Sequence, residues 1–177
     1  MTKEIIIAGF GGQGIVSSGI ILGYAGLFEN MNVTFFPSYG AEMRGGTANC
    51  SIVISTEPVA SPIVANPDIV IIMNEPSLAR FEPTLKPGGL LLYNKTLIKS
   101  RPTRSDIKTI PVEANAVAEK LGQGRIANMV MLGALIKKTD LLKLQTLKKA
   151  QRERFSKAST EQLSLNDKAL EQGYELA

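Results

Sequence analysis

Two glycine-containing segments hold the residues of this chain that could bind a ligand. The first runs from Gly9 to Gly14 and follows an apolar stretch. Its glycines at 9, 11 and 14 have the G-x-G-x-x-G spacing of a strand-to-helix turn, whose backbone N–H groups bind anions such as phosphate. The alternative is a tight turn that needs glycine only for steric reasons. The candidate anion contacts are Gly9, Gly11, Gly12, Gln13 and Gly14.

A nicotinamide dinucleotide site needs one further residue. An acid about 20 residues after the glycines, at the end of the second strand, binds the ribose hydroxyls. Here the expected second strand, 33–36, is followed by Pro37 and Ser38, so no carboxylate stands there. A Walker A loop also fits poorly, because no Lys-Ser/Thr pair follows the glycines. The glycines therefore indicate a fold rather than a ligand, and a stand-alone NAD(P)-binding dehydrogenase is the alternative hypothesis.

The second segment is the polar connection 38–47, which carries a phenol, a carboxylate, a guanidinium and three glycines. Doubly wound folds place ligands beyond the strand ends, where this connection falls. Arg44 could bind a carboxylate or phosphate through two hydrogen bonds, and aromatic, Met and Arg side chains are enriched at interfaces. We predict an interaction surface here, whereas the alternative is an ordered loop held by a Glu42–Arg44 bond. Its candidate residues are Ser38, Tyr39, Glu42 and Arg44.

Missing residue types exclude several chemistries. With no histidine, the chain has no imidazole base and no histidine-ligated metal. Its single cysteine, Cys50, cannot form an internal disulfide or hold an iron–sulfur cluster alone. Because Cys50 shares a strand face with the apolar Ile52 and Ile54, we expect it in the core. The net charge of +4, without a basic stripe interleaved with aromatic residues, does not indicate nucleic acid. No apolar stretch is long enough for a membrane span, so we expect a cytoplasmic protein.

Apolar runs predict the elements that position both segments. Unbroken apolar runs at 4–8 and 69–73 predict central, mutually parallel strands. The link between the strands at 33–36 and 50–54 is too short for a helical crossover, which favours an antiparallel pair. Pro111 indicates that the strand at 107–112 lies at an edge. Helices are expected over 115–121, 127–136, 140–154 and 159–173.

These elements predict an α/β, Rossmann-like three-layer fold with a mixed, mostly parallel sheet. We expect a single domain over 1–177, with an α/β core at 1–137 and a C-terminal helical arm at 138–177.

Six motifs in order give the chain a recognisable resemblance. It resembles the gamma subunit of 2-oxoacid:ferredoxin oxidoreductases over nearly its whole length, closest to the 2-oxoglutarate and branched-chain 2-oxoacid types. One departure is Ala41, where the family commonly has proline. The motifs are Gly9–Gly14, Pro37–Cys50, Asn74–Ser77, Lys86–Gly89, Ala127–Gly133 and Asn166–Tyr174.

The resemblance implies a subunit of a multisubunit enzyme that converts 2-oxoglutarate and CoA to succinyl-CoA and CO2, with ferredoxin or flavodoxin as electron acceptor. It implies thiamine diphosphate and Mg on the alpha and beta subunits and iron–sulfur clusters on beta and a ferredoxin-like delta subunit. This chain would then hold no cofactor or catalytic residue and would support assembly. Its glycine turn would contact CoA or another anion, and segment 38–47 would face a partner subunit or the shared active site. A scaffold without any ligand is a third hypothesis.

Overall fold

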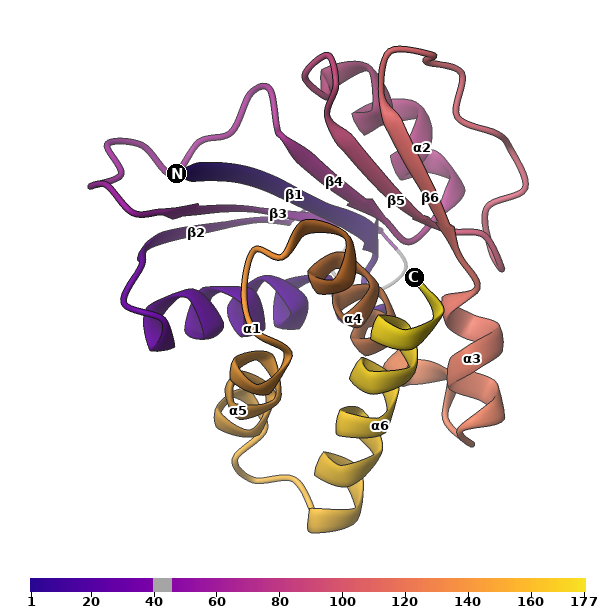
Figure 1. The fold of residues 1–177 in the computed structure, drawn as a ribbon. Coiled ribbons are helices and arrows are strands. Elements are labelled where there is room, and N and C mark those ends of the chain that lie inside the picture. Colours follow the sequence, from indigo (N-terminus) through magenta and orange to yellow (C-terminus); the bar gives the residue numbers. More distant parts are fainter. Residues whose placement is uncertain (40–45) are drawn as a thin grey trace.

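A computed structural model of the protein describes residues 1–39 and 46–177, with only the backbone of Tyr39 (Figure 1). Within these residues the strands form one sheet in the order β2-β3-β1-β4-β5-β6. The strands β1, β4, β5 and β6 are parallel neighbours, whereas β3 is antiparallel to both β1 and β2. Their bounds are β1 Thr2–Phe10, β2 Asn32–Tyr39, β3 Thr47–Ser55, β4 Ile69–Ile72, β5 Leu90–Asn94 and β6 Lys108–Val112.

This topology confirms the predicted fold class. The two unbroken apolar runs form β1 and β4, which are parallel and lie in the middle of the sheet. The pair β2–β3 is antiparallel, as the short connection predicted. The proline-containing strand β6 lies at an edge, where the missing N–H of Pro111 costs no ladder bond to a further strand.

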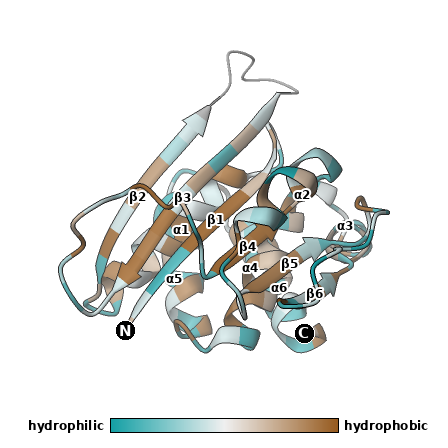
Figure 2. Cartoon of the chain, turned by 90° about the horizontal axis from the view of Figure 1, so that it is seen from above, coloured by the Kyte–Doolittle hydropathy of each residue, from teal (hydrophilic) through white to brown (hydrophobic). Residues whose placement is uncertain are grey.

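Helices cover both faces of the sheet (Figure 1), as the three-layer prediction requires. Successive residues of β1 point to opposite faces, so Ile5 and Ile7 pack on the larger helical layer and Ile6 and Ala8 on the side of α2. Figure 2 shows the hydrophobic residues concentrated in the strands. The helices are α1 Ile15–Phe28, α2 Glu75–Phe81, α3 Ala114–Lys120, α4 Ala127–Thr139, α5 Leu144–Arg154 and α6 Thr160–Leu176, with 3-10 turns η1 Glu82–Thr84 and η2 Gly124–Ile126.

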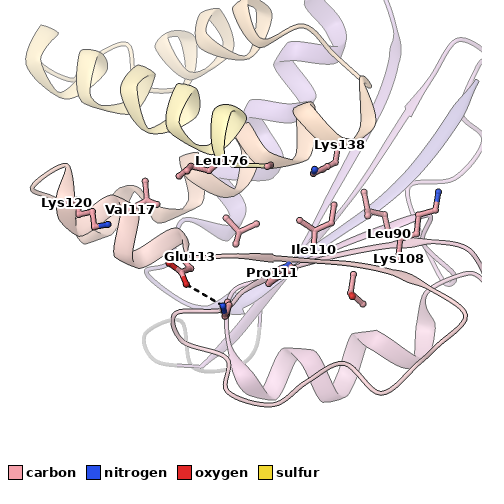
Figure 3. A pocket seen from close by; sticks show the side chains of 13 residues that line it. Leu90, Lys108, Ile110, Pro111, Glu113, Val117, Lys120, Lys138 and Leu176 are labelled. Carbon is pink, nitrogen blue, oxygen red and sulfur yellow. Dashed lines mark ion pairs between the residues drawn. The ribbon is translucent and has the colours of Figure 1, made fainter.

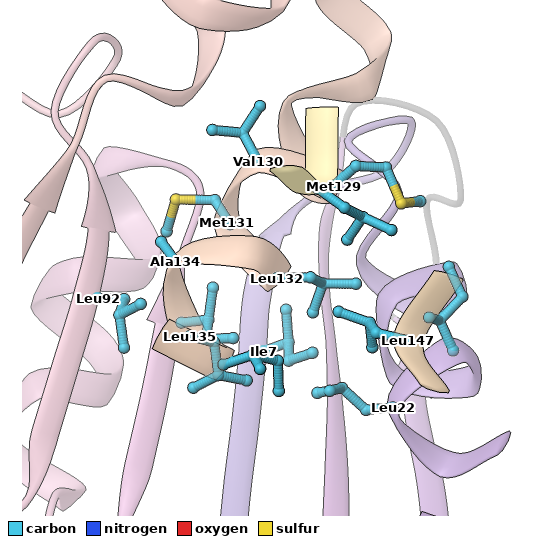
Figure 4. Close-up of a cluster of buried hydrophobic side chains, with 14 of the residues drawn as sticks. Ile7, Leu22, Leu92, Met129, Val130, Met131, Leu132, Ala134, Leu135 and Leu147 are labelled. Atoms are coloured by element: carbon cyan, nitrogen blue, oxygen red, sulfur yellow. The ribbon is translucent and has the colours of Figure 1, made fainter. Parts of the chain in front are cut away.

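The nearly all-apolar helix α4 lies in the middle of the larger helical layer. Figure 4 shows Ile7 of β1 beneath Leu132 and Leu135 of α4, beside Leu22 of α1 and Leu147 of α5. The C-terminal helices complete this layer, since α5 packs on α1 and α6 packs on α4.

The predicted helix ends at 136 and 173 fall three residues before the observed ends of α4 and α6, and one predicted helix start is wrong by four residues. The helix expected from Asp140 begins at Leu144, because Asp140 takes a left-handed conformation with φ of 53° and ends α4. The next two residues, Leu141 and Leu142, are buried in the core as part of the connection. Their apolar side chains gave the segment a helical periodicity that the backbone does not follow.

The prediction that Cys50 is a core residue is confirmed. Its side chain is fully buried on the same sheet face as Ile52 and Ile54. The Sγ atom lies 3.5 Å from the carbonyl oxygen of Ile15, to which the thiol donates a weak hydrogen bond. Burial raises the pKa of the Cys50 thiol to about 12. A thiol that stays protonated is a poor nucleophile and a poor metal ligand.

Candidate functional site

The glycine turn joins the carboxyl end of β1 to the first residue of α1. Gly14 caps this helix with φ of 76°, and Gly12 has φ of 97°. A Cβ atom on Gly9 would lie 2.7 Å from Ile15 Cδ1 and 2.8 Å from Met73 Cβ, and one on Gly14 would lie 2.5 Å from Asn128 Nδ2. At Gly12 no atom of the described residues lies within 4 Å of the corresponding position. Steric contact thus accounts for glycine at 9 and 14, while Gly12 needs glycine for its backbone conformation alone.

The side chain of Gln13 occupies the crevice where doubly wound folds hold their ligands. That crevice lies between β1 and β4, since the chain leaves β1 through α1 on one face and leaves β4 through α2 on the other. Gln13 Oε1 accepts a hydrogen bond from the Phe10 N–H at 2.7 Å, and Gln13 Nε2 donates to the Met73 carbonyl oxygen at 3.1 Å. Gln13 was predicted as an anion contact; its amide bridges the two strand ends through these bonds and also lines the cavity described below.

A second amide, Asn128 of α4, holds the first turn of α1. This side chain is 5% exposed, and its Nδ2 donates to Ser18 Oγ at 3.1 Å and to the Gly14 carbonyl oxygen at 3.4 Å. Ser18 Oγ in turn donates to the same carbonyl at 2.9 Å. In the sequence, Asn128 stands out only as part of a motif, because nothing in local spacing indicates a contact 110 residues away.

Further buried amides follow the other parallel strands. Asn74, after β4, accepts a hydrogen bond from the Ser77 N–H at 3.0 Å and so caps α2. Asn94, at the end of β5, donates through Nδ2 to Asn115 Oδ1 at 2.7 Å. Asn74 Nδ2 and Asn94 Oδ1 are buried without a hydrogen-bond partner among the described residues. The carboxyl edge of the sheet is therefore built from neutral amides.

A cavity of about 230 Å³ opens beside this edge, and among the described residues that line it the exposed Arg125 is the one with an ionisable side chain. Backbone N–H groups, amides and a guanidinium bind anions. None of the described lining residues has a carboxylate, thiol or hydroxyl that could move a proton. It is lined by Gly12, Gln13, Met73, Asn115, Gly124, Arg125 and Ala127.

In the structure, the glycine turn contacts the end of segment 38–47. The Gly11 N–H donates to the Gly46 carbonyl oxygen at 2.9 Å, and Phe10 lies opposite Thr47 in the β1–β3 ladder. Ser38 is exposed near the end of β2, opposite Asn49. Glu42 and Arg44 lie outside the described residues.

The topology also explains the missing ribose-binding acid. A dinucleotide-binding fold has a parallel second strand next to the first, and its carboxyl end holds the acid. Here the neighbour of β1 is the antiparallel β3, and the residue opposite Phe10 is Thr47 at the beginning of that strand. The hairpin β2–β3 thus replaces the strand on which the NAD(P) hypothesis depends.

The sequence of residues 4–176 matches the family described as pyruvate ferredoxin/flavodoxin oxidoreductase. The ketoisovalerate oxidoreductase subunit VorA of Methanothermobacter marburgensis is 41% identical over 133 residues, which are 75% of this chain but only 28% of VorA. The 2-oxoglutarate synthase subunit KorC of Methanocaldococcus jannaschii is 34% identical over 180 residues, which cover 100% of this chain and 95% of KorC.

Two solved structures share the fold. The gamma subunit of a keto/oxoacid ferredoxin oxidoreductase from Geobacter sulfurreducens superposes with a TM-score of 0.86 at 27% identity, covering 99% of this chain and 95% of that one. The 2-oxoglutarate:ferredoxin oxidoreductase of Magnetococcus marinus, with 2-oxoglutarate, coenzyme A and succinyl-CoA bound, gives a TM-score of 0.90 at 28% identity, covering 99% of this chain and 31% of that one. In the described part of the chain, no helix has the length and apolar character needed to cross a membrane.

Proposed function

The chain belongs to the pyruvate ferredoxin/flavodoxin oxidoreductase family, and on that premise we propose that it is the gamma subunit of a cytoplasmic 2-oxoacid:ferredoxin oxidoreductase. The match over residues 4–176 carries this proposal. The neutral amides at the carboxyl edge of the sheet support a structural and binding role rather than catalysis. Its partners in the proposal are the alpha, beta and ferredoxin-like delta subunits, with ferredoxin or flavodoxin as the electron acceptor.

We propose 2-oxoglutarate as the substrate of the complex, which it would convert with CoA to succinyl-CoA and CO2. The support is the match to KorC over the full length of this chain. The second candidate is a branched-chain 2-oxoacid such as ketoisovalerate, favoured by the higher identity to VorA. Comparing kcat/KM of the assembled complex for 2-oxoglutarate, ketoisovalerate and pyruvate distinguishes these candidates.

The cofactors of such a complex do not fit the donor set of this chain. An iron–sulfur cluster needs several thiolates, whereas Cys50 is the only cysteine and is buried with its thiol protonated. We therefore assign the clusters to the companion chains, and on the resemblance to the family we propose that thiamine diphosphate and Mg are held there as well. The backbone of Gly12 and the guanidinium of Arg125, at the cavity beside the glycine turn, are the groups we assign to a contact with CoA or another anion.

Segment 38–47 is proposed to face a companion subunit or the shared active site, with Ser38, Tyr39, Glu42 and Arg44 as its interacting residues. We expect the variant R44A to keep the melting temperature of the isolated chain within about 2 °C, because surface substitutions change stability by less than about 0.5 kcal/mol. It should nevertheless lower the yield of assembled complex. A lower melting temperature with normal assembly would instead support the loop held by its own Glu42–Arg44 bond.

Reconstitution tests the proposed function. The isolated chain should show no 2-oxoacid oxidation and no NAD(P)-linked activity, and the companion chains should copurify with it. Coenzyme A-dependent reduction of ferredoxin should appear only with the companion chains present. Turnover of a 2-oxoacid by the isolated chain, or NAD(P) binding that raises its melting temperature, would contradict the proposal and favour the dehydrogenase hypothesis.

A further inference from the structure

A long groove follows the β6 edge of the sheet, away from the glycine turn. It has a volume of about 760 Å³ and lies between the uncovered end of the β5–β6 face and the ends of α3, α4 and α6. Figure 3 shows Leu90, Lys108 and Ile110 on the sheet beneath Lys138 of α4, with Leu176 of α6 above. The apolar side chains of Leu90, Ile110 and Val117 in the lining are half-buried, and Leu176 is 65% exposed. Apolar grooves with a polar rim are typical of interaction sites.

The rim of the groove is basic. Its charged lining side chains are Lys95, Lys108, Lys120, Lys138 and Glu113. Glu113 lies 3.5 Å from Lys95, as the dashed line in Figure 3 marks. Across residues 1–39 and 46–177, no ion pair is formed by the other three lysines. Among the described residues, the ammonium groups of Lys108, Lys120 and Lys138 therefore have no carboxylate within ion-pair distance, although Glu113 also lines the groove.

The edge of β6 is unsuited to pairing with another strand. The Lys108 N–H donates to the Gly89 carbonyl oxygen, and the Val112 carbonyl oxygen accepts from the Lys95 N–H. Both groups of β6 therefore point toward β5. Backbone direction alternates along a strand, so Thr109 and Pro111 face outward. Because proline has no N–H, a strand added at this edge would lose a ladder bond at its centre. The groove beside the edge, rather than the edge itself, is therefore the surface available to a partner.

A second copy of this chain also fits poorly. A two-fold contact places the same patch on both subunits, so it would bring lysines against lysines. Like charges brought together in an interface are strongly unfavourable. We propose that this groove docks an acidic segment of a companion subunit, with one or two apolar side chains on the floor and carboxylates facing Lys108, Lys120 and Lys138. This proposal rests on the proposed function, which supplies the companion subunits.

The test uses charge reversal in the coexpressed complex. The double variant Lys108→Glu/Lys138→Glu should weaken binding of the companion chains at least about tenfold, since it turns attraction into repulsion. The matched control is Lys157→Glu/Lys168→Glu, which makes the same charge change at two exposed lysines outside the groove. Leu176→Asp tests the apolar floor and should also weaken binding, with the melting temperature of the isolated chain unchanged.

The outcomes separate this proposal from the proposed function. If the wild-type chain copurifies with the companion chains and the groove variants do so equally well, the docking proposal is overturned while the function stands. If the wild-type chain fails to bind them, the proposed function fails. A wild-type dimer in analytical ultracentrifugation that the Lys108→Glu/Lys138→Glu pair abolishes would assign the groove to a second copy. Stabilisation by pyrophosphate that the same pair removes, with assembly intact, would assign it to a small anion.

Discussion

Replacing either of two helix glycines, Gly133 or Gly173, by alanine should destabilise this protein, although alanine is the better helix former. Both residues lie where α4 crosses α6, and each faces the backbone of the other helix. A Cβ atom on Gly173 would overlap the Val130 carbonyl oxygen and lie 2.7 Å from its carbonyl carbon. A Cβ atom on Gly133 would overlap the Leu170 carbonyl oxygen and lie 2.9 Å from the Tyr174 nitrogen.

The size of the effect follows from these contacts. Carbon atoms pack at about 3.5–4.0 Å, so the two helices would have to separate by about 1 Å. Overpacking of this kind lowers the free energy of unfolding by about 1–3 kcal/mol, and by more where the backbone cannot move. The higher helix propensity of alanine offsets only about 1 kcal/mol of this loss. We expect a net loss of about 2 kcal/mol for each variant. In a chain of this size, that loss lowers the melting temperature by about 4–8 °C.

Gly23 of α1 is the matched control. It is a buried helix glycine like the other two, but a Cβ atom there would meet only Val33 Cγ1, at an ordinary 3.6 Å. Gly23→Ala should therefore leave stability unchanged or raise it by up to about 1 kcal/mol. Urea denaturation monitored by circular dichroism measures all three variants. If Gly133→Ala and Gly173→Ala stabilise the protein as much as Gly23→Ala does, the close crossing of α4 and α6 is refuted.

Three further predictions concern the site and the core. Gln13→Ala should lower the free energy of unfolding by about 1–2 kcal/mol in urea denaturation, because it leaves the Phe10 N–H and the Met73 carbonyl without their partner; an unchanged value would mean that water replaces the amide. Gly14→Ala should destabilise the protein more than Gly12→Ala, because both strain the backbone but only position 14 also meets Asn128; equal losses in thermal denaturation would contradict the steric account. The Cys50 thiol should react with a thiol reagent only as fast as the protein unfolds, and rapid labelling of the folded protein would contradict burial. Because burial raises the pKa of this thiol from 9.0 to about 12, its contribution to the free energy of unfolding should be complete below pH 9.0 and should be lost as the pH rises toward about 12. The variant Cys50→Ala should remove this part of the alkaline destabilisation.

Local pattern was enough to predict the framework. The strands β1 and β4 are uninterrupted apolar runs because both of their faces are covered by helices, and this burial can be recognised in the sequence itself. The antiparallel pair β2–β3 followed from the length of its connection, and the edge position of β6 followed from Pro111. These features depend on neighbours in the chain or on burial of a whole segment. Composition likewise excluded histidine chemistry and clusters held by this chain alone.

Only the tertiary structure decided what individual polar residues do. Gln13 bridges two strand ends, and the sequence did not indicate this role because it depends on Met73, 60 residues away. Asn128 looked like one more residue of an apolar helix but holds the first turn of α1. The glycines at 133 and 173 have no local turn to explain them, because their reason is a helix crossing between residues distant in sequence. The lysines that line the groove at β6 likewise come from separate elements, so their spacing in the sequence does not predict that they line one groove.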